Sequence, residues 1–336
     1  MREDRVPVWG VRELAAVLTV DDVMEAVRTA LVDLWRGDIR CPPPCQLTFD
    51  DPSGDCHIKA AQARNSAHFA VKIATGFYAN PRRGLPVNNG IVLLFDARTG
   101  IPSAIFQDHG WITSWRTAAA GALAAQTVAR QGCRLGIVGT GHQAFLQALW
   151  ISRLLQAESV AIVGRSDEAV DRLVERLAEH GVIATNGQHL GSLVGSCDVI
   201  VLCTSSQEAL LHGSDLRPGL SVISLGADGH GKSELAASVF SAVDRIAVDD
   251  YAQCMANGDY GRAVKVAPRL VKPGSMLGEL WAHGDSLRKK DSDSVVITLT
   301  GSGAQDLALA QLAFRRLIDT PSSVLAHERE FATLMP

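Results

Sequence analysis

The stretch GIVGTGHQA at residues 136–144 decides the fold, because it has the order of a strand, a glycine turn and a helix start. Its centre is a GxGxxA turn formed by Gly139, Thr140, Gly141, His142, Gln143 and Ala144. The first glycine permits a tight turn, the second lets the backbone approach a pyrophosphate, and the small last residue lets helix and strand pack closely. The helix start adds free N–H groups and a positive dipole end. The turn therefore predicts a dinucleotide-binding site.

Strand-like and helix-like segments alternate from residue 134 onward. We expect strands at 134–139, 159–164, 197–203, 220–226, 245–250 and 295–300, with helices through Leu149 and from about 168 to 179. This alternation is typical of an α/β fold with a parallel, doubly wound sheet of the Rossmann type. A last apolar helix, DLALAQLAFRRLI at 306–318, is expected to pack back on an earlier domain.

The first third of the chain predicts a mixed α+β domain. Apolar residues recur at helical spacing after Thr19, which can cap the helix, and Gly37 can end it. Proline-rich turns and short strand-like pieces follow at 41–80, and two strands flank a turn within 90–106. We therefore expect a Rossmann domain at 117–306, inserted in an α+β domain made of 1–116 plus 307–336.

Composition and charge exclude several classes of protein. The formal net charge of −4 and the scattered Lys and Arg argue against a nucleic-acid partner. The N-terminus has no apolar signal core and no apolar run is long enough to cross a bilayer, so we expect a cytoplasmic protein with no membrane partner. The seven cysteines form no CxxC pair, so we expect neither a metal site nor a disulfide framework.

The residues after the second expected strand of the Rossmann domain bear on the choice of cofactor. In sites that prefer NAD, this strand usually ends in an acid that binds the ribose 2′-OH. Here it ends Val163-Gly164-Arg165-Ser166, without an acid. A guanidinium beside a hydroxyl suits a 2′-phosphate. Arg165 and Ser166 therefore predict a preference for NADP(H); NAD(H) stays possible if Arg165 is only a solvated surface charge.

Several further stretches, taken together and in order, resemble the ornithine cyclodeaminase and mu-crystallin family. They are Val71-Lys72-Ile73 with Asn80, Gly84-Leu85-Pro86, Asp96 to Gly100, Thr113 to Ala119, the glycine turn, Gly226-Ala227-Asp228, Glu234-Leu235, Val248-Asp249-Asp250, Gly278-Glu279-Leu280 and Gly303-Ala304-Gln305-Asp306. The resemblance implies a homodimer whose α+β domain binds the substrate and dimerises. It also implies hydride exchange at a carbon that bears nitrogen and a carboxylate.

Three residues receive roles in that chemistry. Arg116 is the candidate clamp for the substrate carboxylate, as in the family, because its planar fork can bind bidentately; the alternative is an Arg paired with a structural acid. Lys72 lies in the apolar run FAVKIA, so it needs a depressed pKa or a carboxylate partner, and the resemblance places it against the substrate. Asp228 follows the strand LSVISLG, and the resemblance makes it the general acid or base near the substrate nitrogen.

Other residues complete the expected site. Thr204, after the run CDVIVLC, and Thr117, after Arg116, are expected to contact the cofactor, as is His142 in the glycine turn. His230 and Lys232 receive no role.

The sequence departs from the family pattern near residue 45. The family usually has an Arg where this chain has Cys45, and members that act on ornithine carry a Glu for the second amine where this chain has His57-Ile58-Lys59. Arg40 or Lys59 can stand in for the missing Arg. Lys59 is therefore expected to bind substrate, and with His57 it favours a substrate that carries another anionic group.

The sequence predicts an NADPH-dependent oxidoreductase that acts on CH–NH bonds, reducing a ketimine or a pyrroline-carboxylate-like imino acid, or catalysing the reverse dehydrogenation. Two alternatives remain open. One is a cyclodeaminase, a lyase that converts a diamino acid to a cyclic imino acid on a retained NAD and releases ammonia. The other is a non-catalytic, NADPH-dependent ligand-binding protein.

Overall fold

The computed structural model describes residues 5–50, 54–229 and 231–320. The chain divides into two compact units, unit 1 (Met1–Arg116 with Ser302–Pro336) and unit 2 (Thr117–Gly301). The chain leaves unit 1 within α3 (Trp111–Val128) and returns to it just before α11 (Gly303–Ile318). The return expected at residue 307 falls inside α11, whose first turn already belongs to unit 1.

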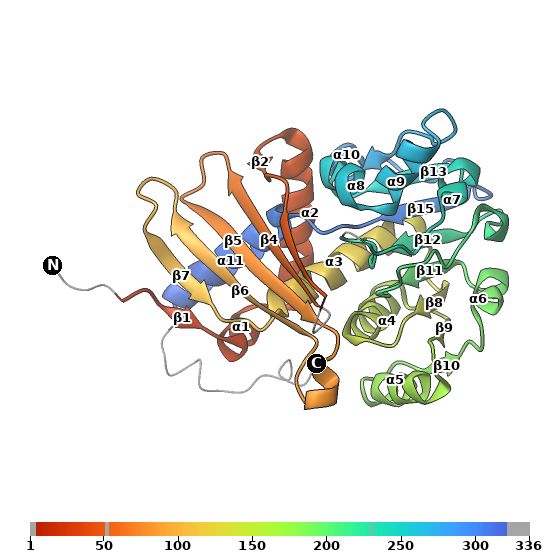
Figure 1. Cartoon of the computed structure of the whole chain (residues 1–336), viewed down its shortest axis with the longest axis horizontal. Coiled ribbons are helices and arrows are strands. Elements are labelled where there is room, and N and C mark those ends of the chain that lie inside the picture. The colour runs from red at the N-terminus through yellow and green to blue at the C-terminus, as the bar shows by residue number, and fades with distance from the viewer. Residues whose placement is uncertain (1–4, 51–53, 230, 321–336) are drawn as a thin grey trace. The chain divides into compact units, whose positions relative to one another are not determined.

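The described part of unit 1 is a seven-stranded sheet with the strand order β1-β7-β6-β5-β4-β2, in which β3 also pairs with β4 (Figure 1). Its strands are β1 (Val8–Trp9), β2 (Ile39–Arg40), β3 (Cys45–Phe49), β4 (Gly54–Ala63), β5 (His68–Phe77), β6 (Asn88–Asp96) and β7 (Pro102–Phe106). Its helices are α1 (Val11–Val17), α2 (Val20–Arg36), α11 and the short 3-10 helix η1 (Asn80–Arg83). The expected α+β character is confirmed.

The expectation of short strand-like pieces at 41–80 is wrong, because β4 and β5 are each ten residues long. They pair antiparallel along most of their length. His57 and Lys59 break the apolar pattern of β4, and Lys72 breaks that of β5, which hides the strands in the sequence. The two strands expected within 90–106 are confirmed as β6 and β7.

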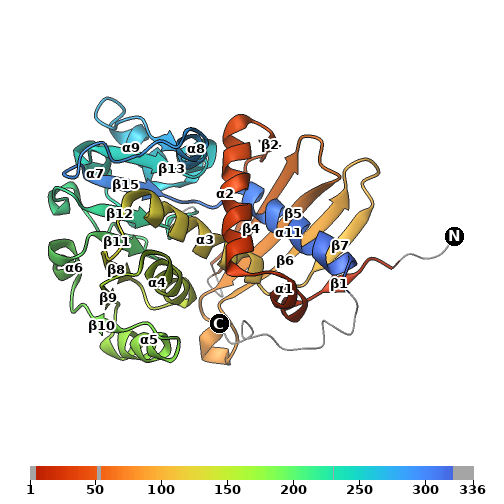
Figure 2. The ribbon, with the colours of Figure 1, turned by 180° about the vertical axis from the view of Figure 1, so that it is seen from behind.

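Helix α2 begins and ends where its sequence predicts. The Thr19 hydroxyl accepts a hydrogen bond from the Asp22 backbone N–H at 3.2 Å, and Gly37 ends the helix in the left-handed conformation. The Asp22 carboxylate also accepts a bond from Arg316 of α11 at 2.6 Å. Figure 2 shows α2 and α11 on the same side of the sheet.

Helix α11 packs closely on the sheet of unit 1. A Cβ atom on Gly303 would lie 2.6 Å from the backbone oxygen of Ala60, so only glycine fits there. Successive side chains of a strand point to opposite faces of the sheet, so those of the unit 1 sheet divide into two sets. One set, which includes Lys72, faces α11, and the other faces away from it.

The described part of unit 2 is an eight-stranded parallel sheet with the order β10-β9-β8-β11-β12-β15-β13-β14. The strands are β8 (Arg134–Val138), β9 (Ser159–Val163), β10 (Ala184–Asn186), β11 (Val199–Leu202), β12 (Ser221–Ser224), β13 (Arg245–Val248), β14 (Ser275–Met276) and β15 (Val295–Thr298). The helices are α4 (His142–Leu155), α5 (Asp167–Glu179), α6 (Leu190–Ser196), α7 (Ala237–Ala242), α8 (Tyr251–Asn257), α9 (Asp259–Val266) and α10 (Leu277–His283), with the 3-10 helix η2 (Gly213–Asp215). The predicted parallel, doubly wound sheet is confirmed.

The sheet order of unit 2 reverses at β8, which lies between β9 and β11. In open α/β sheets, ligands bind beyond the carboxyl ends of the strands at such a switch point. The glycine turn follows β8 directly, so the sequence motif lies at the reversal.

Candidate active site

A buried cluster of charged side chains lies between β5 and α11 in unit 1; we call Lys72, Arg116, Gln305 and Asp306 the Lys72 cluster. Lys72 is 2% exposed, and its Nζ lies 2.8 Å from each carboxylate oxygen of Asp306. The Nε of Arg116 lies 3.4 Å from the same carboxylate. The buried Asp306 carboxylate is therefore the counter-charge of both Lys72 and Arg116.

The protonation of Lys72 is finely balanced. Burial lowers the pKa of Lys72 to about 7, and the Asp306 carboxylate opposes this fall while the positive charges of Arg116 and Lys59 add to it. Burial alone would raise the pKa of Asp306, but the adjacent cations hold it below its ordinary value. At neutral pH Asp306 is therefore ionised, and Lys72 is close to losing its proton.

Arg116 is held loosely compared with Lys72. Its Nη1 donates to the Gln305 side-chain oxygen at 3.4 Å, and its Nε has no hydrogen bond of good geometry among the described residues. A guanidinium carries five N–H donors in a planar fork, whose shape suits a carboxylate. The contact with Asp306 also supports the alternative of an Arg paired with a structural acid.

Asp306 and Gln305 were missed as site residues, although both belong to the stretches that carry the family resemblance. The signal for Asp306 was present, since Lys72 in an apolar run calls for a buried carboxylate. The partner lies 234 residues away in sequence, on the last helix of the described chain. Spacing alone cannot select it from the chain's other acids.

The two proposed substitutes for the family Arg occupy different environments in unit 1. Arg40 and Cys45 are exposed. Lys59 is 5% exposed and lies directly across the strand pair from Lys72. Lys59 therefore joins the buried charges near the Lys72 cluster, whereas Arg40 does not.

The glycine turn of unit 2 has the geometry that its sequence predicts. Gly139 has φ of 124°, and a Cβ atom there would lie 2.7 Å from the Cys203 backbone oxygen, so this position requires glycine. Gly141 is the N-cap of α4, so Thr140, Gln143 and the buried Ala144 surround the free N–H groups at the start of that helix. These groups fit a pyrophosphate.

His142 and the residues after β9 complete the expected cofactor contacts. Burial lowers the pKa of His142 to about 4, and Arg176 adds to the effect, so His142 is neutral at neutral pH and brings no charge to a phosphate. Arg165 and Ser166 are both exposed, and the Ser166 hydroxyl caps α5 by accepting a bond from the Ala169 N–H at 3.3 Å. The exposed Arg165 is therefore accessible to a ligand, whereas Ser166 also stabilises the start of α5.

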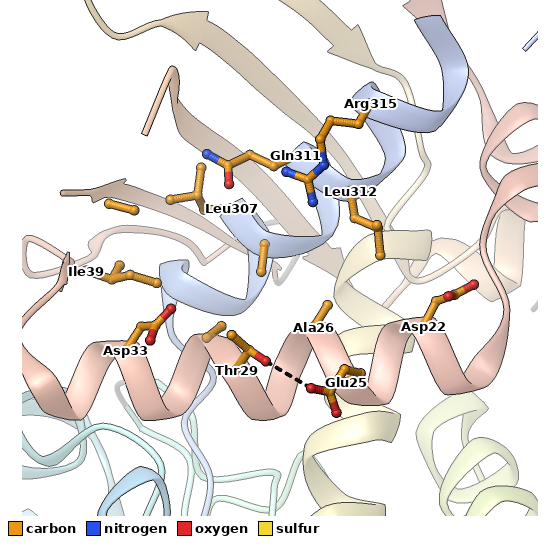
Figure 3. Close-up of a pocket in the computed structure, with 13 residues that line it drawn as sticks. Asp22, Glu25, Ala26, Thr29, Asp33, Ile39, Leu307, Gln311, Leu312 and Arg315 are labelled. Atoms are coloured by element: carbon orange, nitrogen blue, oxygen red, sulfur yellow. Dashed lines mark hydrogen bonds between the residues drawn. The ribbon is translucent and has the colours of Figure 1, made fainter. Parts of the chain in front are cut away.

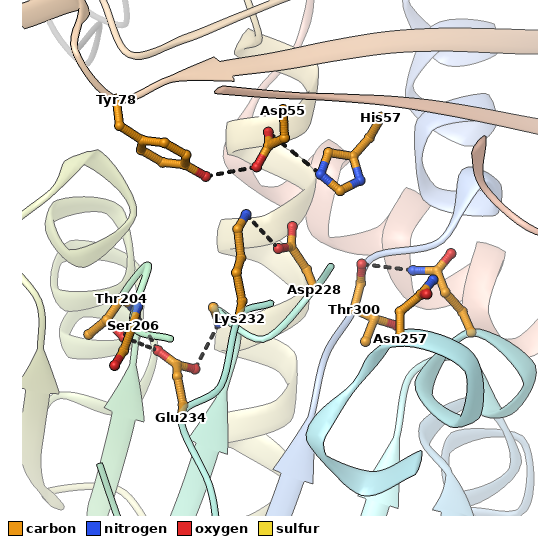
Figure 4. A network of polar contacts seen from close by, with 12 residues as sticks. Asp55, His57, Tyr78, Thr204, Ser206, Asp228, Lys232, Glu234, Asn257 and Thr300 are labelled. Atoms are coloured by element: carbon orange, nitrogen blue, oxygen red, sulfur yellow. Dashed lines mark hydrogen bonds and ion pairs between the residues drawn. The ribbon is translucent and has the colours of Figure 1, made fainter. Parts of the chain in front are cut away.

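A buried glutamate fastens the loops that follow β11 and β12 (Figure 4). Glu234 is fully buried, and its carboxylate accepts bonds from the backbone N–H groups of Thr204 and Gly226 at 2.7 and 2.8 Å. It also accepts bonds from the hydroxyls of Thr204 and Ser224 at 2.8 and 2.7 Å. Thr204 is therefore fixed at the carboxyl end of β11, where the sequence places a cofactor contact. The other expected contact, Thr117, is half-buried, and its carbonyl accepts a bond from Gln147 at 3.0 Å.

Asp228 lies on the loop after β12 and pairs with Lys232, to which the sequence analysis assigns no role. The Asp228 carboxylate accepts a bond from Lys232 Nζ at 3.0 Å (Figure 4). The two side chains are 35% and 17% exposed, so the pair is open to a small ligand. His230 lies outside the described residues. An acid and an amine in direct contact can exchange and hold a proton.

A groove on unit 1 lies elsewhere, between α2 and α11 (Figure 3). Acidic side chains of α2, among them Glu25 and Asp33, line one wall, and Arg315 lines the other. None of the expected site residues lines it, so we place the candidate site at the Lys72 cluster.

Within the described ranges, no His, Cys, Asp and Glu side chains group as three or more possible metal ligands. None of the helices described is long and apolar enough to span a membrane.

Comparison with known proteins identifies the family. The model of the ornithine cyclodeaminase/mu-crystallin family matches residues 8–320. An uncharacterized cyclodeaminase of Sinorhizobium fredii is 31% identical over 90% of this chain and 91% of its own length. A putative dehydrogenase of Rhizobium meliloti is 32% identical, over 90% of each chain.

Two solved structures share the whole fold. One is an archaeal alanine dehydrogenase dimer with bound NAD, with a TM-score of 0.82 at 26% identity over 94% of this chain and 96% of the other. The second is the iminosuccinate reductase of Paracoccus denitrificans in complex with NAD+, with a TM-score of 0.81 at 27% identity and the same coverage.

The chain belongs to the ornithine cyclodeaminase/mu-crystallin family, as its sequence predicts. The expected class of enzyme, an NAD(P)-dependent oxidoreductase of CH–NH donors, is confirmed at that level, since the named relatives include dehydrogenases and reductases of amino and imino acids.

The Lys72 cluster yields a stability prediction. Replacing Asp306 by Asn leaves two buried cations without their counter-charge, so we expect Asp306→Asn to lower the free energy of unfolding by about 3 kcal/mol. Urea unfolding at neutral pH measures this. The matched control is Asp291→Asn, which breaks an ion pair with Arg130 whose side chains are both 82% exposed and should leave stability almost unchanged. Equal effects of the two substitutions would contradict the assignment of a buried, mutually dependent cluster.

Proposed function

We propose that the chain is an NADPH-dependent oxidoreductase that reduces the C=N bond of an imino acid to an amino acid, or catalyses the reverse dehydrogenation. The observation that carries the proposal is the Lys72 cluster, in which two cations share one buried acid and so retain an affinity for one more carboxylate. Such a site holds the carboxylate next to the reacting carbon in a fixed position. A bound nicotinamide cofactor supplies the hydride.

In this proposal Lys72 and Arg116 bind the substrate carboxylate, and Asp306 positions both. Lys72 has a pKa near neutrality, so it can also donate a proton to a substrate oxygen or nitrogen. Asp228 transfers the proton at the substrate nitrogen, and the ammonium of Lys232 at 3.0 Å keeps that carboxylate oriented. The glycine turn, Arg165, Ser166, Thr204 and Thr117 are the proposed cofactor contacts.

We propose NADP(H) as the preferred cofactor. The support is the exposed Arg165 after β9 and the absence of an acid at the end of that strand. The similar structures contain NAD or NAD+, so NAD(H) is the alternative. Asp167 and Glu168 in the first turn of α5 would repel a 2′-phosphate, which makes the contribution of Arg165 decisive.

A cyclodeaminase reaction is the second candidate, favoured by the relative of that name in Sinorhizobium fredii. Stoichiometry separates the two reactions. Incubation of the protein and NADPH with 2-oxo acids plus amines, and with cyclic imino acids, should consume one NADPH for each amino acid formed. A lyase would instead release ammonia from a diamino acid with no net change in cofactor absorbance. Tight NADPH binding without either reaction would favour the ligand-binding protein.

A cytoplasmic location stays a prediction.

We propose that the protein is a homodimer. The sheet face of unit 1 that points away from α11 carries a continuous apolar surface, and Figures 1 and 2 place α2 and α11 on the opposite side. This apolar sheet face consists of Leu47, Phe49, Ile58, Phe69, Val71, Ile73, Ile91, Leu93 and Phe95, all at least partly exposed. A patch of this kind marks an interaction surface, and a second copy is the partner we infer.

The role of Asp228 predicts the effect of its amide. General acid–base catalysis contributes about 10²- to 10⁴-fold, so Asp228→Asn should lower kcat by at least about 10²-fold while the dissociation constant of NADPH stays unchanged. Steady-state kinetics and fluorescence titration of NADPH measure the two quantities. Turnover near that of the wild type would overturn the role.

The cofactor proposal predicts a higher kcat/KM with NADPH than with NADH, by at least about tenfold, since a charge-assisted hydrogen bond contributes about 1.5–3 kcal/mol. Arg165→Asp should reverse or abolish the preference. Arg172→Asp, which changes an exposed Arg within α5, is the matched control and should keep it. A wild-type preference for NADH would refute the proposal.

The dimer proposal predicts that light scattering after gel filtration gives twice the chain mass. Phe69 stacks on Phe95 at 5.0 Å within the apolar sheet face, so Phe69→Glu should shift the protein to the monomer mass. Ile183→Glu, at an isoleucine of unit 2 that is 86% exposed, should stay dimeric. A monomeric wild type, or a dimeric Phe69→Glu, would exclude this face as the interface.

A further inference from the structure

A row of buried polar side chains runs along β4, on the face of the unit 1 sheet that carries Lys72. Asp55, His57 and Lys59 alternate with apolar residues and are 8%, 9% and 5% exposed. Figure 4 shows Asp55 and His57 projecting from the same side of the strand. Burial of three ionisable groups in one row is costly unless they interact with each other or with a ligand.

The register of the sheet places this row beside the Lys72 cluster. Lys59 is paired with Lys72, so their Cβ atoms are about 5 Å apart. His57 is paired with Ala74 and lies one alternation, about 7 Å, further along β4. The residue paired with His57, Ala74, has a small side chain.

Two lysines directly across a strand pair repel each other. The positive charge of Lys59 is one cause of the lowered pKa of Lys72. A lysine opposite Lys72 therefore lowers the stability of the fold. Groups kept at such a cost are candidates for function. An anion bound beside both lysines would reduce this repulsion.

His57 supplies the independent observation that points to a ligand. Its Nε2 is buried and has no hydrogen-bond partner among the described residues. The Asp55 carboxylate lies 3.6 Å away, too far for a hydrogen bond, and it is held in place by the Tyr78 hydroxyl at 2.9 Å (Figure 4). Asp55 therefore leaves the Nε2 of His57 for another group.

We propose that Lys59 and His57 form a second anion-binding subsite, and that the substrate is an imino acid with a second carboxylate on its side chain. This inference rests on the proposed function. The first carboxylate binds Lys72 and Arg116, and the second binds Lys59 and His57. A substrate with a basic side chain would meet the like charge of Lys59.

The reaction itself is unchanged by the second carboxylate. The hydride of NADPH goes to the imine carbon, a proton goes to the nitrogen, and the C=N bond becomes a C–N single bond as NADPH becomes NADP+. The side-chain carboxylate takes no part in the chemistry and contributes only to selection. Selection should therefore show in kcat/KM ratios between substrates.

The test uses pairs of substrates that differ only in this carboxylate. With ammonia and NADPH, 2-oxoglutarate is compared with 2-oxopentanoate, and oxaloacetate with 2-oxobutyrate. We expect the dicarboxylate of at least one pair to have a kcat/KM at least about tenfold higher, as one charge-assisted contact allows. A ratio of one or below in both pairs would overturn the proposal.

Two variants assign the preference to the subsite. Lys59→Met keeps the length of the side chain and removes its charge, and His57→Gln keeps a donor without a charge. Each should lower the dicarboxylate ratio by at least about tenfold, whereas Arg64→Met, at an exposed cation paired with Asp38, should leave it unchanged. An unchanged ratio in both subsite variants would contradict the assignment, and thermal unfolding checks that each variant is folded.

A failure of the proposed function is distinguishable from a failure of this inference. If no 2-oxo acid supports NADPH oxidation, the reaction is wrong, and calorimetric titration of the protein–NADP+ complex with L-glutamate and L-norvaline still tests the subsite. Tighter binding of L-glutamate, lost in Lys59→Met, would support it. Equal binding of the two amino acids would overturn it.

Discussion

The buried ion pair between Lys72 and Asp306 is the interaction on which the rest of the structure depends. It joins β5 to α11 across 234 residues of sequence, so unit 1 requires both ends of the chain. Placing a lysine and a carboxylate at 2% exposure is costly, and a hydrophobic pair of the same volume would often be at least as stable. The ion pair leaves Arg116 only loosely satisfied, and it keeps the pKa of Lys72 near neutrality. We propose that this cost in stability is retained because the site binds a substrate carboxylate.

Buried acids have a different task in unit 2, where they order loops at the carboxyl ends of parallel strands. Glu234 accepts the backbone N–H groups of Thr204 and Gly226, and Asp259 accepts those of Glu234 and Leu235 at 2.9 and 3.0 Å. Asp249 likewise accepts the N–H of Gly301 at 2.6 Å, at the end of the unit. Each carboxylate satisfies several donors that the end of a strand would otherwise leave unpaired. The loop that carries Asp228 is thereby fixed at both ends while Asp228 itself stays accessible.

Local patterns predicted unit 2 and the start of unit 1 well, because the residues that decide them are neighbours in sequence. The glycine turn, the alternation after residue 134, and the Thr19 cap are of this kind. Helix α4 continues to Leu155, beyond the predicted Leu149, because apolar packing carries it on. The length of β4 could not be predicted in this way, because its charged residues interrupt the apolar pattern of a strand. The partner of Lys72 could not be predicted either, because Asp306 is one acid among many until the fold brings it to β5. Lys232 was missed because its contact with Asp228 depends on how the loop closes.

The central claim is that the chain transfers a hydride to an imine carbon with net oxidation of the cofactor. NADPH carrying deuterium at the transferable position of its nicotinamide ring tests this most directly, when it is oxidised in the presence of a 2-oxo acid and ammonia and the amino acid product is weighed by mass spectrometry. Our account predicts one deuterium on the α-carbon for each NADPH consumed. Product that carries no deuterium, or release of ammonia from a diamino acid while the cofactor is left unchanged, would contradict it.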